Sequence, residues 1–158
     1  MGATGRRVTE AGLGGPGPRR AVIALSARLC VDASFALDAC ARTAGLDLVA
    51  DYELVAPPLM WSEFRSALHE GVWRGVVEPA IAEGARARLA KSRITRQDPD
   101  QLDATAWAIA DELGVAKTYD AEYLALARLL GAVVITVDAR LRRGADRLGL
   151  VIGPTELA

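Results

Sequence analysis

The stretch Ala132–Leu141, AVVITVDARL, decides the fold class that the sequence predicts. The β-branched run over 133–137 is typical of a buried strand. The run ends at Asp138, and a helical pattern begins immediately after it. Asp is among the best helix N-caps, because its carboxylate accepts hydrogen bonds from free backbone N–H groups, so Asp138 alone is explained by a structural role. A strand that leads directly into a helix is nevertheless the unit of parallel α/β sheets, whose functional sites gather at the carboxyl ends of the strands.

The same order of strand and helix recurs along the chain. RLCV (28–31) predicts a strand ending at Asp32, and YELVAP (52–57) predicts a second one before Pro57 and Pro58, which suit a helix start. The polar segment RITRQDPD (93–100) is expected to be a connection. Helices are predicted over 34–45 with Gly45 as its end, 59–72, 78–92, 101–114, 120–131 and 139–149, with a last short strand over 150–153. Alternating strands and helices predict a three-layer α/β/α domain over residues 28–158, with a mainly parallel central sheet.

Composition narrows the function classes. The net charge of −1 and the pI of about 5.9 exclude a generally basic nucleic-acid binder, so any contact with nucleic acid needs a local basic patch or a metal. Cys30 and Cys40 are expected to be buried free thiols, which together with the absence of a long apolar run predicts a cytoplasmic chain with no membrane span. Residues 1–27, rich in Gly and with Pro16 and Pro18, are expected to be a poorly ordered extension.

Four acidic residues occupy positions, after predicted strands or in helices, at which catalytic or metal-binding side chains are often found in such folds. Asp32 and Asp138 each follow a predicted strand, Asp120 begins a helix, and Glu63 interrupts an apolar helical run. Each has a bland explanation as a cap or a solvated position. If the four converge, like charges repel, and a divalent cation would relieve the repulsion. Carboxylates are hard oxygen ligands that suit Mg²⁺ or Mn²⁺, whereas zinc is disfavoured by the single His. An acid-only metal site suits phosphodiester chemistry.

Three segments, VDASFALDAC, APPLMWSEFRSAL and YDAEYLALARLLGAVVITVDARL, resemble the acidic motifs of PIN-domain nucleases, and most closely the VapC-type ribonuclease toxins of bacterial toxin–antitoxin pairs. The resemblance covers about residues 28–154. It implies that Asp32, Glu63, Asp120 and Asp138 are the metal-site acids, that Ser34 and Thr136 support them, and that Mg²⁺ is the cofactor. It also implies hydrolysis of an RNA phosphodiester by a metal-activated water, a small antitoxin as protein partner, and a homodimer. Ser66 stands where many members of the family carry Asn.

The basic helix after Asp138 has two interpretations. Arg140, Arg142 and Arg143 are a solvated face by default, and a phosphate-positioning patch if the chain binds RNA. Lys117 and Arg65 are weaker candidates of the same kind. The three tryptophans, Trp61, Trp73 and Trp107, are expected to be core or dimer contacts rather than base-stacking platforms, and Tyr119 is expected to pack rather than to react.

Three alternatives to a ribonuclease toxin remain open. A housekeeping PIN nuclease for RNA maturation would carry the same acids and lack a neighbouring antitoxin gene. A catalytically silent PIN module that only binds would lack metal-dependent cleavage, although the four acids are all present. A phosphotransfer domain would use Asp32 or Asp138 as acceptor, but the Lys and the adjoining second acid that it normally needs are not visible.

Overall fold

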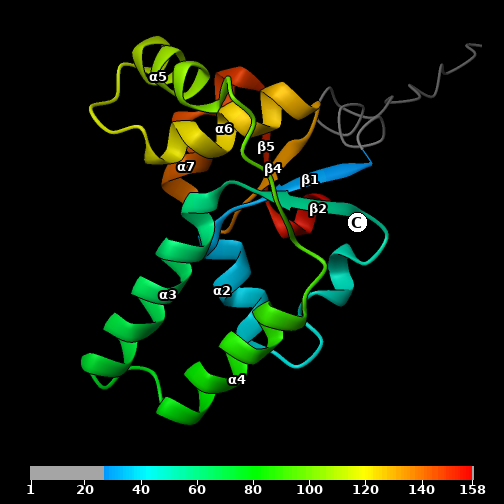
Figure 1. Cartoon of the computed structure of the whole chain (residues 1–158), viewed down its shortest axis with the longest axis vertical. Helices are drawn as coiled ribbons and strands as arrows, with labels where there is room; N and C mark the ends of the chain where they lie inside the picture. Colours follow the sequence, from blue (N-terminus) through cyan, green and yellow to red (C-terminus); the bar gives the residue numbers. More distant parts are fainter. Residues whose placement is uncertain (1–26, 158) are drawn as a thin grey trace, which may run out of the picture.

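A computed structural model describes residues 27–157, which form one parallel sheet covered by helices (Figure 1). The strand order is β3-β2-β1-β4-β5, and every neighbouring pair is parallel. The predicted mainly parallel sheet is therefore confirmed. The strands are β1 (Arg28–Val31), β2 (Glu53–Ala56), β3 (Thr95–Arg96), β4 (Val133–Ile135) and β5 (Val151–Ile152).

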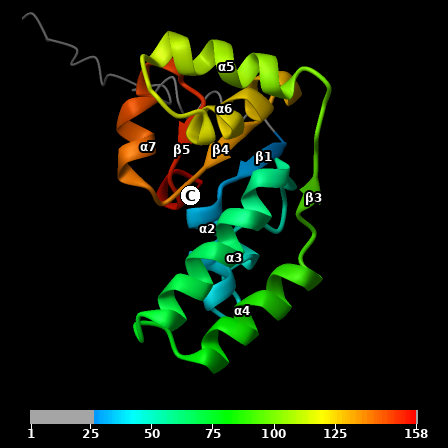
Figure 2. The same ribbon diagram turned by 60° about the vertical axis from the view of Figure 1, so that its left-hand side comes forward.

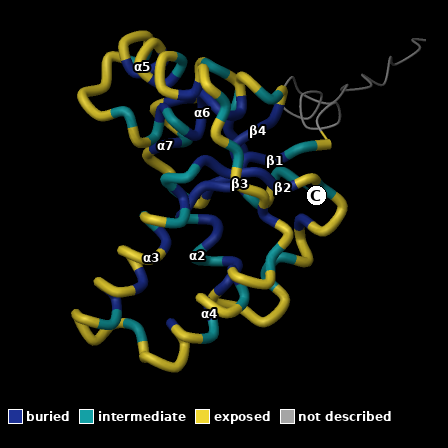
Figure 3. The backbone as a smooth tube through the Cα atoms, viewed as in Figure 1, coloured by how far each residue is buried: buried dark blue, intermediate teal, exposed yellow. Residues whose placement is uncertain are grey.

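Helices cover both faces of the sheet (Figures 1 and 2). On one side lie α2 (Ala33–Ala41), α3 (Pro58–Trp73) and α4 (Pro79–Lys91), and on the other lie α5 (Leu102–Leu113), α6 (Tyr119–Leu130) and α7 (Ala139–Gly144). Three short 3₁₀ helices lie in the connections, at Asp47–Val49, Asp146–Leu148 and Pro154–Glu156. The central strands and the inward helix faces are buried, whereas the edge strand β3 and the outer faces of α3, α4 and α5 are exposed (Figure 3). The predicted three-layer arrangement is confirmed.

The register of the two central strands brings the future site together. Leu29, Cys30 and Val31 of β1 pair with Val133, Val134 and Ile135 of β4. Asp32 follows β1 and Thr136 follows β4, so the two residues leave the sheet side by side at its carboxyl edge. The backbone N–H of Asp32 still donates to the Ile135 carbonyl, at 3.3 Å.

Two helix ends follow the sequence, and one does not. Gly114 and Gly131 end α5 and α6 in the left-handed conformation, with φ of 68° and 61°, as the glycines predict. Helix α2, in contrast, ends at Ala41, four residues before Gly45. The predicted end at Gly45 is wrong. Gly45 instead allows the chain to pass over α2, because a Cβ there would lie 2.1 Å from the Ala39 carbonyl oxygen.

Other boundaries also moved. The polar connection 93–100 contains the edge strand β3, which forms because Gln97 N–H donates to the Ala56 carbonyl at 3.0 Å and the Thr95 hydroxyl donates to the Leu54 carbonyl at 3.1 Å. Strand β4 ends at Ile135, and the basic helix ends at Gly144. The final strand is confined to Val151–Ile152.

Both cysteines are buried and free, as the sequence predicts. Within residues 27–157, every helix is too short or too polar to cross a bilayer. The expected poorly ordered extension lies outside the described residues, except for its last residue.

Candidate acidic site at the carboxyl edge of the sheet

Asp32 is the centre of a buried hydrogen-bond network. Its side chain is 5% exposed, and its Oδ1 accepts from the Phe35 N–H at 2.8 Å, which makes Asp32 the N-cap of α2. Its Oδ2 accepts from the Thr136 hydroxyl at 2.7 Å, and the Ser34 hydroxyl lies 2.9 and 3.0 Å from the two oxygens. Both predicted supporting residues therefore contact the carboxylate.

The hydroxyl groups of Ser34 and Thr136 also join the two strand ends. Val137 N–H donates to Ser34 Oγ at 3.2 Å, and Asp138 N–H donates to Thr136 Oγ1 at 2.9 Å. Each hydroxyl thus accepts from the backbone after β4 while its single hydrogen is available to the Asp32 carboxylate. The network fixes the orientation of Asp32 and the path of the chain into Asp138.

Asp138 is both a cap and a neighbour of the other acids. Its Oδ1 accepts from the N–H groups of Arg140 and Leu141, at 2.7 and 3.3 Å, at the start of α7. Burial raises the pKa of both Asp32 and Asp120, and the Asp138 charge adds to each rise. The structural role that the sequence suggested is present, and it holds the carboxylate next to two other acids.

Asp120 has no capping role. It lies in the first turn of α6, whose N-cap residue, Thr118, makes no side-chain capping bond. Burial raises the pKa of Asp120; the Arg140 guanidinium opposes that rise, and the Asp138 carboxylate adds to it. The need for a helix cap therefore does not account for Asp120.

Glu63 accepts a hydrogen bond from a residue that is distant in the sequence. The Tyr123 hydroxyl of α6 donates to Glu63 Oε2 on α3 at 2.5 Å, and Tyr123 is 2% exposed. Burial, then the Glu63 contact and then the Asp32 charge raise the pKa of Tyr123, which keeps it a neutral donor. The sequence analysis did not single out Tyr123 as a site residue. Its position one helical turn after Asp120 was the one sequence feature that could have indicated it.

The electrostatics of the site are those of crowded acids. Burial raises the pKa of Asp32 from 3.8 to about 6, against the hydrogen bonds from Phe35, Thr136 and Ser34, and the Asp138 charge raises it further. Ionised carboxylates that repel one another in a partly buried edge favour a compensating cation. Asp32, Asp120 and Asp138 are thus coupled through Asp138, and Glu63 joins them through Tyr123.

The donor chemistry fits a hard divalent cation, because the available ligands are carboxylate and hydroxyl oxygens. Among residues 27–157, however, no three His, Cys, Asp or Glu side chains stand in a ready set of metal ligands. Asp32 already accepts three hydrogen bonds, and Asp138 uses Oδ1 for its cap. Asp32 and Asp138 lie together at the carboxyl edge of the sheet, and the four-ligand assignment stays a prediction.

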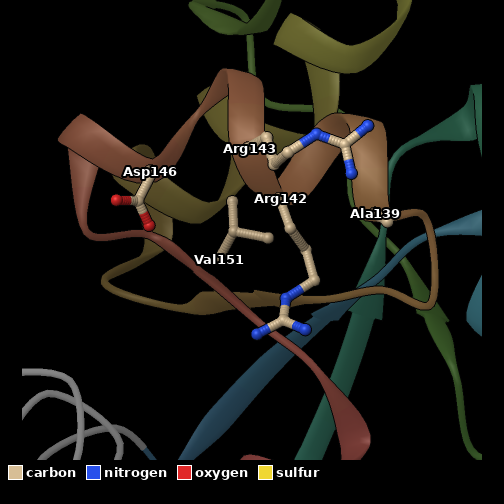
Figure 4. Close-up of a pocket in the computed structure, with 5 residues that line it drawn as sticks. All are labelled: Ala139, Arg142, Arg143, Asp146 and Val151. Atoms are coloured by element: carbon tan, nitrogen blue, oxygen red, sulfur yellow. The ribbon is translucent and has the colours of Figure 1, made fainter.

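The three arginines of α7 separate into different environments. Arg140 lines a cavity that also contains Asp120. Arg142 forms an ion pair with Glu156, and Arg143 is exposed. Figure 4 shows the guanidinium groups of Arg142 and Arg143 pointing away from one another around a second pocket, which Asp146 also lines. The predicted RNA-binding patch is therefore divided, and Arg140 alone adjoins the acids.

Most of the aromatic residues weighed in the sequence are exposed, and one of them departs from expectation. Tyr119 is 54% exposed and Trp107 is 65% exposed. Trp73 is the most exposed, at 84%, while Trp61 packs partly against the core. The expectation that Tyr119 packs is wrong, since the start of α6 faces outward on that side.

The fold and the acidic edge define a class, and comparison with known proteins identifies it. A family model described as PIN domain matches residues 29–147. The crystal structure of PAE2754 from Pyrobaculum aerophilum is similar, with a TM-score of 0.64 and 27% identity, covering 82% of this chain and 92% of that one. The chain belongs to the PIN-domain family.

Similarity to individual proteins assigns the chain to a particular type within the PIN-domain family. The chain is 33% identical over 121 residues to Ribonuclease VapC3 of Mycobacterium tuberculosis, in both strain CDC 1551 / Oshkosh and strain H37Rv. The match covers 73% of this chain and 86% of each relative. Within the PIN-domain family, the chain is therefore of the VapC type.

Proposed function

We propose that the chain is a metal-dependent endoribonuclease that acts as the toxin of a toxin–antitoxin pair. The observation that carries the proposal is the placement of Asp32 and Asp138 after the paired strands β1 and β4, where the Thr136 hydroxyl donates to Asp32 and accepts from the Asp138 N–H. Burial raises the pKa of Asp120, and the nearby Asp138 charge adds to that rise. One of the three, Asp120, has no capping role that explains it. The similarity to Ribonuclease VapC3 supports RNA as the substrate.

The acids of the site would bind the metal ion, and the residues hydrogen-bonded to them would fix their orientation. Asp32, Asp120, Asp138 and Glu63 would hold Mg²⁺, or Mn²⁺ in its place, directly or through water. A bound divalent ion lowers the pKa of a coordinated water and offsets charge on the scissile phosphate. Ser34 and Thr136 keep the Asp32 carboxylate oriented with both oxygens hydrogen-bonded. The Tyr123 hydroxyl fixes Glu63 in the same way.

The first test is cleavage of a fluorogenic RNA with Mg²⁺ or with chelator. Asp32→Asn, Glu63→Gln, Asp120→Asn and Asp138→Asn should each lower the rate by orders of magnitude while the protein remains folded. Asp51→Asn is the matched control, since Asp51 is an exposed acid in the turn before β2, at the other end of the strands. Full activity in any two of the four variants would overturn the site assignment.

The second test separates a toxin from related nucleases. Expression of the wild-type chain in bacterial cytoplasm should arrest growth, and Asp120→Asn should relieve the arrest. A small antitoxin encoded beside the chain should restore growth and copurify with a homodimer of the chain. Cleavage without growth arrest would point to a nuclease of RNA maturation, and RNA binding without cleavage would point to a silent binding module.

A further inference from the structure

A cavity lies next to the proposed metal site, and Asp120 is one of the residues that line it. It lies between the end of α5, the start of α6 and α7, and its volume is about 390 Å³, a size that suits a small ligand or one nucleotide. Its walls include Val115, Lys117, Tyr119, Asp120, Arg140 and Leu141. The cavity therefore adjoins an acid of the site on one side and presents apolar and basic groups on the others.

The apolar part of the cavity is unusually exposed. Tyr119 is 54% exposed and Val115 is 45% exposed, whereas Leu141, beside them, is 5% exposed and belongs to the core. Nucleobases stack on exposed aromatic rings, and Tyr119 is such a residue among those that line the cavity. The packing of the domain does not account for the outward position of Tyr119.

The basic part consists of Lys117 and Arg140. Neither forms an ion pair or a side-chain hydrogen bond within residues 27–157, in contrast to Arg142, which is paired with Glu156. Arg140 follows Asp138 by two residues and is close enough to Asp120 for its charge to affect that acid. The two cations therefore lie where a backbone phosphate next to the acidic site would pass.

We propose that this cavity is a nucleotide subsite for single-stranded RNA, in which a base next to the scissile phosphate stacks on Tyr119 while Arg140 and Lys117 contact the backbone phosphate. The proposal rests on the proposed function, because it takes RNA as the substrate and the acidic edge as the place of cleavage. It assigns Tyr119 as a substrate-binding residue that contributes to the choice of the cleavage position. Charge complementarity favours RNA over an apolar protein segment, since a purely apolar partner would give Lys117, which is unpaired within residues 27–157, no compensating charge.

The binding experiment uses the full chain carrying Asp32→Asn, which prevents cleavage, with Mg²⁺ and a short fluorescent single-stranded RNA. In this background Tyr119→Ala should weaken binding roughly 5- to 100-fold, the range found when a stacking ring is removed, and Tyr119→Phe should keep most of the affinity. Trp107→Ala is the matched control, because Trp107 is a 65% exposed aromatic on α5 that does not line the cavity. Equal affinity for Tyr119→Ala and Trp107→Ala would overturn the proposal.

A kinetic and a chemical measurement complete the test. In the otherwise wild-type chain, Tyr119→Ala should lower kcat/KM for RNA by a similar factor and change the preferred cleavage position, with the Mg²⁺-induced rise in melting temperature unchanged. An RNA with a photoreactive base should crosslink to the segment 115–119. Crosslinks elsewhere, with unaltered cleavage positions, would contradict the subsite.

The outcomes distinguish this proposal from the proposed function. If the chain binds RNA through Tyr119 but cleaves none, the nuclease assignment fails and the subsite stands. If the chain cleaves RNA and Tyr119→Ala changes neither affinity nor position, the nuclease assignment stands and the subsite fails. Tight binding of a protein partner at Tyr119, with no RNA affinity, would overturn the subsite.

Discussion

Replacing Asp138 by Asn should make the protein more stable without metal and inactive with it. Asn is as good an N-cap as Asp, so the hydrogen bonds to Arg140 and Leu141 N–H can be kept. The substitution removes one negative charge that raises the pKa of Asp32 and Asp120. A pure capping role would leave stability nearly unchanged, whereas a place among crowded acids predicts a gain in chelator.

The size of the gain follows from Asp32. The rise of its pKa from 3.8 to about 6 corresponds to roughly 3 kcal/mol for ionising this 5% exposed carboxyl in the folded protein. Burial is the main cause and Asp138 a smaller one, so the substitution should recover about 0.5–1 kcal/mol. For a domain of this size, that is a rise in melting temperature of roughly 2–4 °C.

The gain should depend on pH with a definite sign. Because the folded pKa of Asp32 lies above the unfolded one, wild-type stability falls as pH rises from about 4 to about 6, and this contribution is constant above. Asp138→Asn lowers the folded pKa of Asp32 and so reduces that loss. The advantage of the variant should be full at pH 8 and absent below about pH 4.

The assay is a set of thermal melts in chelator and in millimolar Mg²⁺, at pH 8 and at pH 4. Mg²⁺ should stabilise the wild type by mass action and the variant much less. Asp51→Asn, which also removes one negative charge, controls for net charge and should shift neither the apo stability nor the Mg²⁺ response. A variant that melts below wild type in chelator, with equal Mg²⁺ shifts in both, would refute the acid-cluster interpretation of Asp138.

Three further predictions concern the neighbours of the site. Arg140→Ala should lower the slope of log affinity for single-stranded RNA against log salt by about 0.7, with a smaller change for Arg143→Ala; equal slopes in titrations would contradict the division of α7. Thr136→Val should cost about 1–3 kcal/mol in denaturant melts, because Asp138 N–H and the Asp32 carboxylate each lose a partner, and should move the acid limb of the pH–rate profile upward; an unmoved limb would argue against the network. Gly131→Ala should cost about 1 kcal/mol, since its φ is 61°, with cleavage unaffected.

Local sequence was sufficient for most of the elements. Periodicity and caps gave the order of strands and helices, and Gly114 and Gly131 marked two helix ends, because left-handed backbone at a C-terminus favours glycine. The edge strand β3 was missed, since Thr95–Arg96 is exposed and polar and pairs only because β2 offers its free edge. The end of α2 was predicted too late in the sequence. Gly45 is required because the chain passes close to the Ala39 backbone there, a contact that no local sequence pattern shows.

For the site, the sequence by itself determined which acids follow strands and which begin helices. Tertiary structure decided that β1 and β4 are neighbours in register, which sets Asp32 beside Thr136 and within the field of Asp138. It also decided the contact from Tyr123 to Glu63 and the exposure of Tyr119. The physical reason is range: capping and periodicity act over a few residues, whereas burial, charge coupling and cavities depend on which distant segments the sheet order brings together.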